Sequence, residues 1–271
     1  MAKIISVNAG SSSLKFQLFE MDDESVITSG VIERIGLEDS IFTIKYQGEK
    51  SVTTQNIKDH KVAVQLLLDT LVEKGIVKDL NEIKGVGHRV VQGGAYFDSS
   101  VVIDEDVVNK IDELKSLAPL HNPAHLTGYY AFKEAIPNAG AVAVFDTAFH
   151  QTLEPRCYIY PIPYKYYTDY KVRKYGAHGT SHFYVSQRAI DLLGNPEHSK
   201  IIVAHLGAGG SLSAVKDGKS INTSMGFTPL AGIMMGTRSG DVDPSVIDYL
   251  IEEVGMDMHD VINMLNKESG L

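Results

Sequence analysis

The stretch AGSSSLKF (residues 9–16) decides the fold, because a turn of small residues in it separates two runs with strand character. The run KIISVN (3–8) leads into the turn, and the run LKFQLF (14–19) leaves it. A third run, SVITSGVI (25–32), follows the acidic turn MDDE. Short runs rich in β-branched and aromatic residues and bounded by turn residues are typical of strands. The sequence therefore predicts a three-stranded meander at the N-terminus.

The same order of elements returns later in the chain. The stretch IIVAHLGAGGSLSAVKDGKSINTS (201–224) predicts a strand, a glycine-rich turn, a strand, a polar turn and a strand. Aligning AGSSSLKF with AGGSLSAV (208–215) gives a weak internal repeat, which indicates two related half-structures. Turns of small residues let backbone N–H groups approach a phosphate, although hairpins use such turns as well. Neither turn has the Walker A pattern or the full dinucleotide fingerprint.

Helical patterns and one further strand separate the two repeats. HKVAVQLLLDTLVEKG (60–75) places apolar residues on one helix face and ends in a glycine that can stop the helix. Asn122 and Pro123 suit the cap and the first position of another helix. The apolar run AVAVFD (141–146) predicts a buried strand. It ends in the carboxylate Asp146, at the strand end where open α/β sheets usually bind ligands.

A segment rich in proline and tyrosine, residues 155–170, separates the first repeat from the second. We place the domain boundary ahead of it, which gives domains 1–149 and 150–271. Two helices are predicted in the second domain, over 181–193 and from the cap Asp243. The last residues, MLNKESGL (264–271), predict neither a strand nor a capped helix. We therefore expect the second domain to be incomplete.

Composition excludes several classes of protein. The chain has 271 residues, 44% hydrophobic and 22% charged, as expected for an ordinary globular protein of two domains. Its net charge of -9 argues against general affinity for nucleic acid or anionic membrane. No apolar run approaches the roughly 20 residues of a membrane-spanning helix. The single cysteine, Cys157, and the absence of a secretion signal favour a cytoplasmic location.

Several polar residues stand where an anion could bind. Asn8 lies at the mouth of the first turn and is followed by Ser11, Ser13 and Lys15. In GHRVVQGG (87–94), Arg89 stands between apolar residues, and a charge there is costly unless it is paired or faces an anion. Arg238 lies in the loop MGTRSGDVDP, where flanking glycines let the guanidinium reach into a cleft.

Histidines occur in two further runs. FDTAFHQ combines Asp146 with His150, and YGAHGTSHFYV places His178 just before a helix and His182 one turn later. The i,i+4 pair could bind zinc, but the H-E-x-x-H pattern is absent and only one histidine would lie securely in the helix. Spacing alone favours a capping or packing role for His178 over catalysis.

Seven motifs in order span the whole chain: VNAGSSSLKF, GHRVVQGG, APLHNPAH, VFDTAFHQ, YGAHGTSH, HLGAGGSLSAV and MGFTPLAGIMMGTRSGDVDP. Together they resemble the acetate kinase (acetokinase) family. The resemblance implies an α/β fold of two ribonuclease-H-like (actin-like ATPase) domains closing on ATP, the second incomplete in this chain. It also implies reversible transfer of the ATP γ-phosphoryl group to acetate, with Mg²⁺.

Residue roles follow from the resemblance by motif. Asn8 resembles the residue near the magnesium ion, and Arg89 and Arg238 resemble the arginines that hold the carboxylate and the transferring phosphoryl group. Asp146 resembles the catalytic carboxylate, and His178 the group that stabilises the transition state. The nucleotide-phosphate groups correspond to Ser11, Ser13, Lys15, His205, Leu206, Gly207, Ala208 and Gly209. His121 falls near the acyl site, and the pocket for the methyl group corresponds to Val91, Leu120 and Pro229.

Two residues and the chain length depart from the family pattern. Ala177 stands where the family typically has an aromatic residue, so we expect a wider acyl pocket and better acceptance of propionate. Ala208 replaces a usual asparagine, which removes one side-chain contact to ATP. Family members extend well past residue 271, so we expect this chain alone to be inactive, and the full-length enzyme to be a homodimer.

Two other functions compete with this interpretation. A butyrate or related carboxylate kinase is the close alternative, which activity against a series of acids distinguishes. A nucleotide-driven switch of the actin and chaperone superfamily is the distant one. The paired arginines Arg89 and Arg238 argue against a switch, because a switch has no carboxylate substrate to hold.

Overall fold

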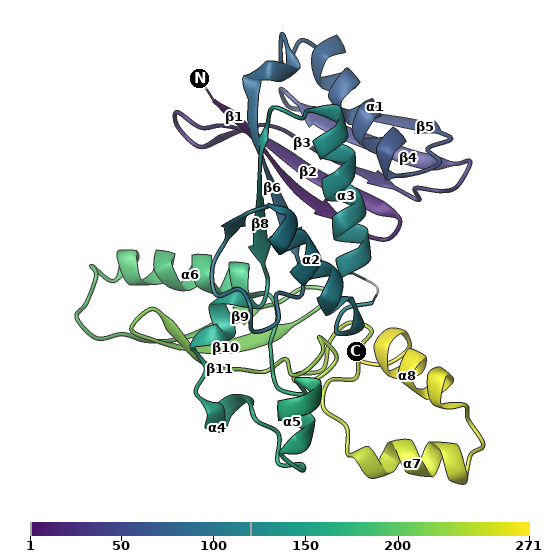
Figure 1. Ribbon diagram of the computed structural model, residues 1–271, viewed down its shortest axis with the longest axis vertical. Helices are drawn as coiled ribbons and strands as arrows, with labels where there is room; N and C mark the ends of the chain where they lie inside the picture. Colours follow the sequence, from purple (N-terminus) through teal and green to yellow (C-terminus); the bar gives the residue numbers. More distant parts are fainter. Residues whose placement is uncertain (1, 120) are drawn as a thin grey trace. The chain divides into compact units, whose positions relative to one another are not determined.

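A mixed sheet of eight strands organises the first of two units in the computed structural model, which describes residues 2–119 and 121–271 (Figure 1). The two units are Met1–Phe145 and Asp146–Leu271. In space, the strands follow the order β5-β4-β3-β2-β1-β6-β8-β7. Their bounds are β1 Lys3–Ala9, β2 Ser13–Glu20, β3 Ser25–Glu33, β4 Ser40–Tyr46, β5 Glu49–Gln55, β6 Ile83–Val90, β7 Val101–Val102 and β8 Gly140–Phe145.

Strands β1 to β5 form an antiparallel meander, as predicted for the first three, whereas β6 runs parallel to β1 and β8 runs parallel to β6. Parallel neighbours need long crossovers, and helices supply them here. The helices of this unit are α1 His60–Glu73, α2 Glu105–Glu113 and α3 Asn122–Ala135, with short 3₁₀ helices at Leu80–Glu82 and Leu114–Ser116.

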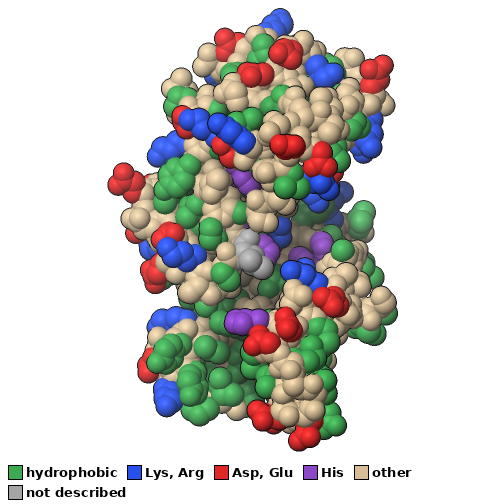
Figure 2. Space-filling view, turned by 90° about the vertical axis from the view of Figure 1, so that its right-hand side faces the viewer, with side chains coloured by type: hydrophobic (Ala, Val, Ile, Leu, Met, Phe, Trp, Pro, Cys, Tyr) green, Lys and Arg blue, Asp and Glu red, His purple; other side chains and the backbone are tan. Residues whose placement is uncertain are grey.

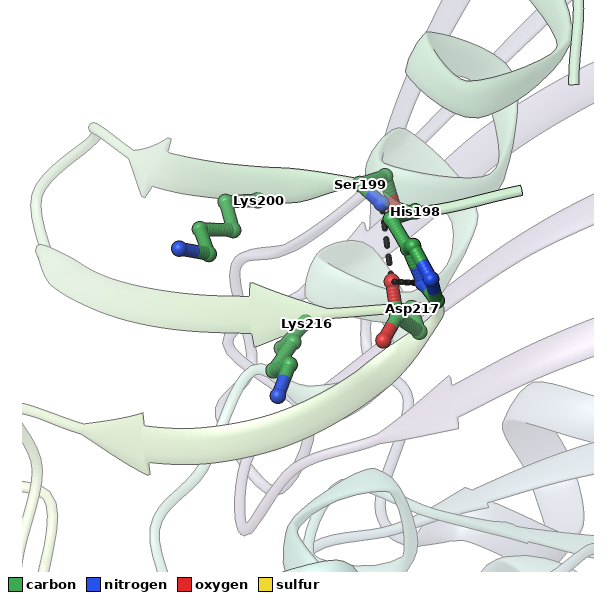
Figure 3. A pocket seen from close by; sticks show the side chains of 5 residues that line it. All are labelled: His198, Ser199, Lys200, Lys216 and Asp217. Carbon is green, nitrogen blue, oxygen red and sulfur yellow. Dashed lines mark hydrogen bonds and ion pairs between the residues drawn. The ribbon is translucent and has the colours of Figure 1, made fainter. Parts of the chain in front are cut away.

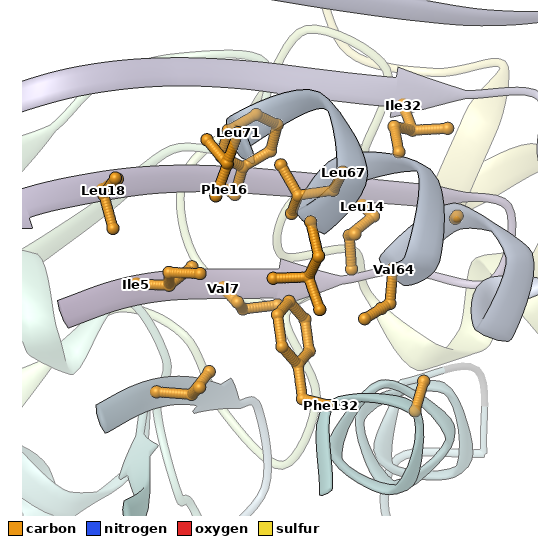
Figure 4. Close-up of a cluster of buried hydrophobic side chains, with 14 of the residues drawn as sticks. Ile5, Val7, Leu14, Phe16, Leu18, Ile32, Val64, Leu67, Leu71 and Phe132 are labelled. Atoms are coloured by element: carbon orange, nitrogen blue, oxygen red, sulfur yellow. The ribbon is translucent and has the colours of Figure 1, made fainter. Parts of the chain in front are cut away.

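The core of the first unit lies between one face of the sheet and helices α1 and α3 (Figure 4). Alternate residues of β2 point into it, and Leu14, Phe16 and Leu18 are buried. The predicted helix face of α1 is fully buried as well, through Val64, Leu67, Leu68 and Leu71. Each such side chain stabilises the fold by roughly 2 kcal/mol. Because side chains alternate across a strand, the residues between them point to the opposite face.

The second unit is built on a three-stranded antiparallel sheet of order β11-β10-β9. Its strands are β9 Lys200–His205, β10 Ser211–Lys216 and β11 Lys219–Thr223, which confirms the predicted strand-turn-strand-turn-strand order. Helix α6 packs against β9, and α7 packs against α8. The helices are α4 Pro155–Tyr158, α5 Lys165–Tyr170, α6 Gly179–Leu192, α7 Pro244–Glu252 and α8 Met258–Lys267, with a 3₁₀ helix at Ala148–Thr152.

Two local predictions were wrong. Asn122 does not cap α3, since His121 holds the cap position without a side-chain hydrogen bond and the Asn122 amide bonds to other backbone groups. The residues MLNKESGL do contain helix, because α8 is capped by the Asp257 side chain and continues to Lys267. Val261 and Leu265 are buried along this helix, so packing holds it in addition to its cap.

Candidate active site

Three neighbouring strands align polar side chains on the face of the first sheet that is turned away from the core. Asn8 on β1 lies directly opposite Lys15 on β2, and opposed residues share a face. Arg89 on β6 follows His88, which pairs with Val7, so it comes level with Asn8. The Arg89 Nη1 donates a hydrogen bond to the Asn8 Oδ1 at 3.2 Å. The structure therefore brings three of the predicted residues into one line.

The turn between β1 and β2 is tight. The Gly10 N–H donates to the Ser13 carbonyl at 2.8 Å, and a Cβ at position 10 would lie 2.9 Å from the Ser13 Oγ. The His60 Nε2 lies 2.7 Å from the Gly10 carbonyl oxygen, which ties the turn to the start of α1. Ser11 and Lys15 are exposed at this turn and the strand that leaves it. Small residues at this turn leave its backbone N–H groups accessible to a ligand, as predicted from the sequence.

A buried amide holds the loop that carries Val91. The Asn122 Oδ1 accepts from the Gln92 N–H at 3.2 Å, and its Nδ2 donates to the carbonyls of Gln92 and Ile111. Val91 is buried, whereas His121, the residue before Asn122, is exposed at the start of α3. Leu120, the third residue expected here, lies outside the described residues.

In the second unit, the backbone of Asp146 is hydrogen-bonded to Gly179, the residue that follows His178. The Gly179 N–H donates to the Asp146 carbonyl at 2.8 Å, and a Cβ at position 179 would lie only 2.2 Å from that oxygen. Only glycine fits such a contact. His178, just before it, has φ +58° and ψ +19°, in the left-handed region. Non-glycine residues held there cost on the order of 1 kcal/mol or more and cluster at active sites. The Asp146 side chain is buried.

Arg238 and His178 converge on the glycine-rich turn after β9. A Cβ at Gly209 would lie 3.3 Å from the Arg238 Nη1, 3.5 Å from the His178 Cε1 and 3.6 Å from its Nε2. The Arg238 Nη1 donates to the Pro229 carbonyl at 3.1 Å, which orients the guanidinium. The Gly236 N–H donates to the Ala208 carbonyl at 3.2 Å, so the loop that carries Arg238 is tied to the turn.

The rest of this turn is open. Leu206, Gly207 and Ala208 are exposed, and His205 is half-buried. The His205 and His178 rings are stacked with centroids 4.0 Å apart. The His205 Nδ1 lies 2.8 Å from the Ser181 Oγ, and this contact fixes the His205 ring of the stack. The structure thus brings together His178, Arg238, Pro229 and the turn residues, all predicted from the sequence.

The sequence indicated His150 and His182, but not the serine hydroxyls that these rings contact behind His178. The Ser211 Oγ lies 2.8 Å from the His178 Nδ1 and 2.8 Å from the His182 Nε2. His150 is fully buried, and burial lowers its pKa to about 4, so the ring is neutral at pH 7. Its Nε2 lies 3.1 Å from the Ala177 carbonyl and so donates to it, leaving the Nδ1 to accept from the Ser220 hydroxyl.

Ala177 is packed inside the second unit. Its side chain is buried in a cluster with Met225 and Met235. A phenylalanine at this position would therefore have to displace methionines, and overpacking of a buried cluster typically costs about 1–3 kcal/mol. The expectation of a wider acyl pocket stays a prediction, which substrate choice in the unaltered chain tests better than the Ala177→Phe variant.

Asn8 could supply one protein oxygen to a magnesium ion. Among them, no group of three or more histidine, cysteine, aspartate or glutamate residues could bind a metal. Magnesium in ATP-dependent enzymes is typically bound by one or two protein oxygens, by phosphates and by water. Asn8 offers such an oxygen, since its Oδ1 accepts one hydrogen bond from Arg89 and can accept a second.

On the face drawn in Figure 2, acidic and basic side chains of the described residues are interspersed and do not gather into one basic field. None of the helices in the described part of the chain is both long and apolar enough to cross a bilayer.

A surface hollow lies at the end of the second sheet opposite the glycine-rich turn (Figure 3). Its lining residues are His198, Ser199, Lys200, Lys216 and Asp217, where β9 begins and β10 ends. The Asp217 carboxylate accepts from the Ser199 N–H at 2.8 Å, which lowers its pKa. Because the glycine-rich turn, where His178 and Arg238 converge, joins the other ends of β9 and β10, this hollow is separate from the candidate site.

Comparison with known proteins identifies related chains. A model of the acetokinase family matches residues 3–271. The acetate kinases of Bacillus cytotoxicus and Bacillus subtilis are 59% and 57% identical to this chain over 272 residues. Each alignment covers 100% of this chain, and 68% and 69% of the respective relative.

Solved structures of acetate and propionate kinases also match this chain. The acetate kinase of Porphyromonas gingivalis matches with a TM-score of 0.95 and 43% identity, and a propionate kinase of Francisella tularensis matches with a TM-score of 0.94 and 45% identity. Both matches cover 100% of this chain and 69% of the solved chain. The α/β fold of these kinases is therefore the fold of this chain.

Proposed function

Because the chain belongs to the acetokinase family, we propose that it is an acetate kinase, which transfers the γ-phosphoryl group of ATP reversibly to acetate. A carboxylate oxygen of acetate bonds to the γ-phosphorus while the bond to the β,γ-bridging oxygen breaks. That oxygen leaves on ADP, and acetyl phosphate is the other product. The observation that carries the proposal is the convergence of Arg238 and His178 at Gly209.

Charge is the main obstacle to this reaction. Acetate and the γ-phosphate are both anions, so their approach needs cations and an aligned attacking oxygen. We assign Arg89 to the carboxylate and Arg238 to the transferring phosphoryl group, since a planar guanidinium can bind two oxygens at once. Each arginine is already oriented by an oxygen acceptor, Asn8 for Arg89 and the Pro229 carbonyl for Arg238.

No strong base is required, because acetate is ionised at neutral pH. The buried Asp146 therefore orients cationic or metal-bound groups and does not remove a proton. His178 donates a hydrogen bond to the phosphoryl oxygens as charge shifts in the transition state. Its fixed backbone at the start of α6 supports this role, since preorganised donors need no rearrangement during the reaction.

The two turns of small residues bind the phosphates of ATP in this proposal. The first turn contributes Ser11 and Ser13 with Lys15, and the second contributes His205, Leu206, Gly207, Ala208 and Gly209. Exposed backbone around Gly207 supports the second assignment. When bound, Mg²⁺ neutralises phosphate charge, and Asn8 would hold it from the protein side.

The acyl group would be held by Val91, Leu120 and Pro229, with His121 nearby. Propionate is the second candidate acceptor, because a solved propionate kinase is 45% identical to this chain. Ala177 in place of the family's usual aromatic residue supports that alternative. Residues 1–149 and 150–271 would form the two ribonuclease-H-like domains of a cytoplasmic enzyme that works as a homodimer.

Trapping of acyl phosphate by hydroxylamine, with Mg-ATP and acetate, propionate or butyrate, tests the proposal. Two polypeptides are assayed: the 271-residue chain, and the same chain joined after Leu271 to the segment of the Bacillus subtilis relative that the alignment leaves out. We expect at least the extended polypeptide to form acyl phosphate, and its kcat/KM to be highest for acetate. Nucleotide binding by both polypeptides without trapped product from any of the acids would contradict it.

A further inference from the structure

The hydroxyl of Ser211 lies between two histidine rings of the second unit. Its Oγ is 2.8 Å from the His178 Nδ1 and 2.8 Å from the His182 Nε2. Ser211 is the first residue of β10 and is fully buried, as is His182 on α6. A serine hydroxyl has one proton, so it can donate to only one of two ring nitrogens and must accept from the other.

The direction of this pair of hydrogen bonds follows from His182. Burial, and next the nearby His150, lower the pKa of His182 to about 3, so its ring is neutral and carries one N–H at pH 7. Its Nδ1 is buried without a hydrogen-bond partner among the described residues. A buried N–H without a partner is rarer and costlier than a bare acceptor. The proton therefore sits on the His182 Nε2 and is donated to the Ser211 Oγ.

The next link is then fixed. Having accepted from His182, the buried Ser211 hydroxyl donates its own proton to the His178 Nδ1, because accepting from both rings would leave that proton without an acceptor among the hydrogen bonds of the described residues. A neutral His178 with an accepting Nδ1 must carry its proton on Nε2. This nitrogen is on the side of the ring that faces Gly209, where the Arg238 Nη1 also points. The His205 ring, stacked at 4.0 Å, limits tilting of the same imidazole.

We propose that His182 and Ser211 are positioning residues that hold His178 as the Nε2–H tautomer, so that a neutral imidazole donates to the transferring phosphoryl group beside Arg238. The inference rests on the proposed function for the role of the donated hydrogen bond. The tautomer itself follows from the hydrogen-bond geometry together with the neutral His182 ring, and does not depend on that function. His182, Ser211 and His178 form a chain of fixed hydrogen bonds. No proton needs to move along this chain during the reaction.

Long-range ¹H–¹⁵N correlation NMR of the ¹⁵N-histidine-labelled 271-residue chain at pH 7.5 reads the tautomer directly. The His178→Asn variant serves only to assign the His178 signals. We expect a protonated Nε2 and an accepting Nδ1 for His178. A dominant Nδ1–H tautomer in the unaltered chain would overturn the proposal, whatever any variant does.

Variants then test this chain of hydrogen bonds. Ser211→Ala should release the tautomer preference and lower kcat about tenfold to a hundredfold, less than the hundredfold to thousandfold typical of removing a transition-state donor outright. Ser211→Thr keeps the hydroxyl and should restore both the tautomer and kcat. His182→Gln keeps a donor toward Ser211, whereas His182→Met has similar length and none, so only the methionine variant should behave like Ser211→Ala.

The kinetics of these variants are measured in whichever of the two polypeptides forms acyl phosphate. The KM values for ATP and acetate should stay within about threefold of those of the unaltered enzyme, because the substitutions do not alter ground-state binding. An unchanged His178 tautomer in Ser211→Ala, or an unchanged kcat once the tautomer is lost, would overturn the positioning role. The expected tautomers in a chain that forms no acyl phosphate in either polypeptide would instead contradict only the proposed function.

Discussion

Replacing Arg238 by alanine removes the cation that points at the glycine-rich turn. The side chain is half-buried and held by the Pro229 carbonyl. At an effective dielectric constant of about 20, two unit charges 4 Å apart interact by about 4 kcal/mol. Loss of that amount from the transition state slows the reaction by about a thousandfold. The expected range agrees with arginines in other phosphoryl transfers, which contribute a thousandfold or more.

Steady-state assay of acyl phosphate formation measures this effect. We expect Arg238→Ala to lower kcat about a thousandfold, and Arg238→Lys to retain part of the rate because it keeps the charge and loses the planar fork. Arg188→Ala is the matched control, since Arg188 lies on α6 with its side chain 58% exposed and paired with Asp191 at 3.7 Å. A kcat for Arg238→Ala within tenfold of the unaltered enzyme would refute the assignment.

Three further predictions concern single side chains. Asp146→Asn should lower kcat by tenfold or more in the same assay, because it removes the buried charge that orients cationic groups; near-normal kcat would refute that role. Asn122→Ala should lower the free energy of unfolding in urea by about 2–3 kcal/mol, because buried backbone groups lose their partner, whereas the exposed Asn263→Ala should change it little. Burial lowers the pKa of His88 to about 4, so the unfolded chain binds more protons than the native one between pH 6.5 and 4. The free energy of unfolding should therefore keep its full value above pH 6.5 and decrease toward pH 4, and His88 should account for on the order of 3 kcal/mol of that decrease. Urea unfolding at several pH values measures it, and a decrease of equal size in His88→Leu would contradict this prediction.

The regular elements could be predicted because their residues repeat with the period of the element. Leu14, Phe16 and Leu18 alternate along β2, and Leu67 and Leu71 recur at helical spacing on α1, so burial of one face specifies each element. Asn122 misled for a physical reason, because its amide makes tertiary hydrogen bonds that compete with capping. Local preference cannot reveal that competition.

Part of the candidate site could be predicted as well, through motifs that the fold brings together within one unit. Arg238 and Gly209 are separated along the chain, and the fold brings them together at one turn. Their roles stay predictions until variants are assayed. Ser211 could not be predicted, because it contacts His178 from 33 residues away and a serine that starts a strand carries no periodic signal. The i,i+4 spacing of His178 and His182 was the available hint, and the structure links the two through that hydroxyl.

The most direct test of the central claim follows the oxygen atoms. Acetate labelled with ¹⁸O in its carboxylate is incubated with Mg-ATP and the enzyme, and the products are examined by ³¹P NMR. Attack of the carboxylate on the γ-phosphorus predicts acetyl phosphate in which the phosphorus carries one ¹⁸O from acetate, together with an equal amount of ADP. Formation of ADP and unlabelled inorganic phosphate alone would contradict the account and indicate a nucleotide-hydrolysing protein.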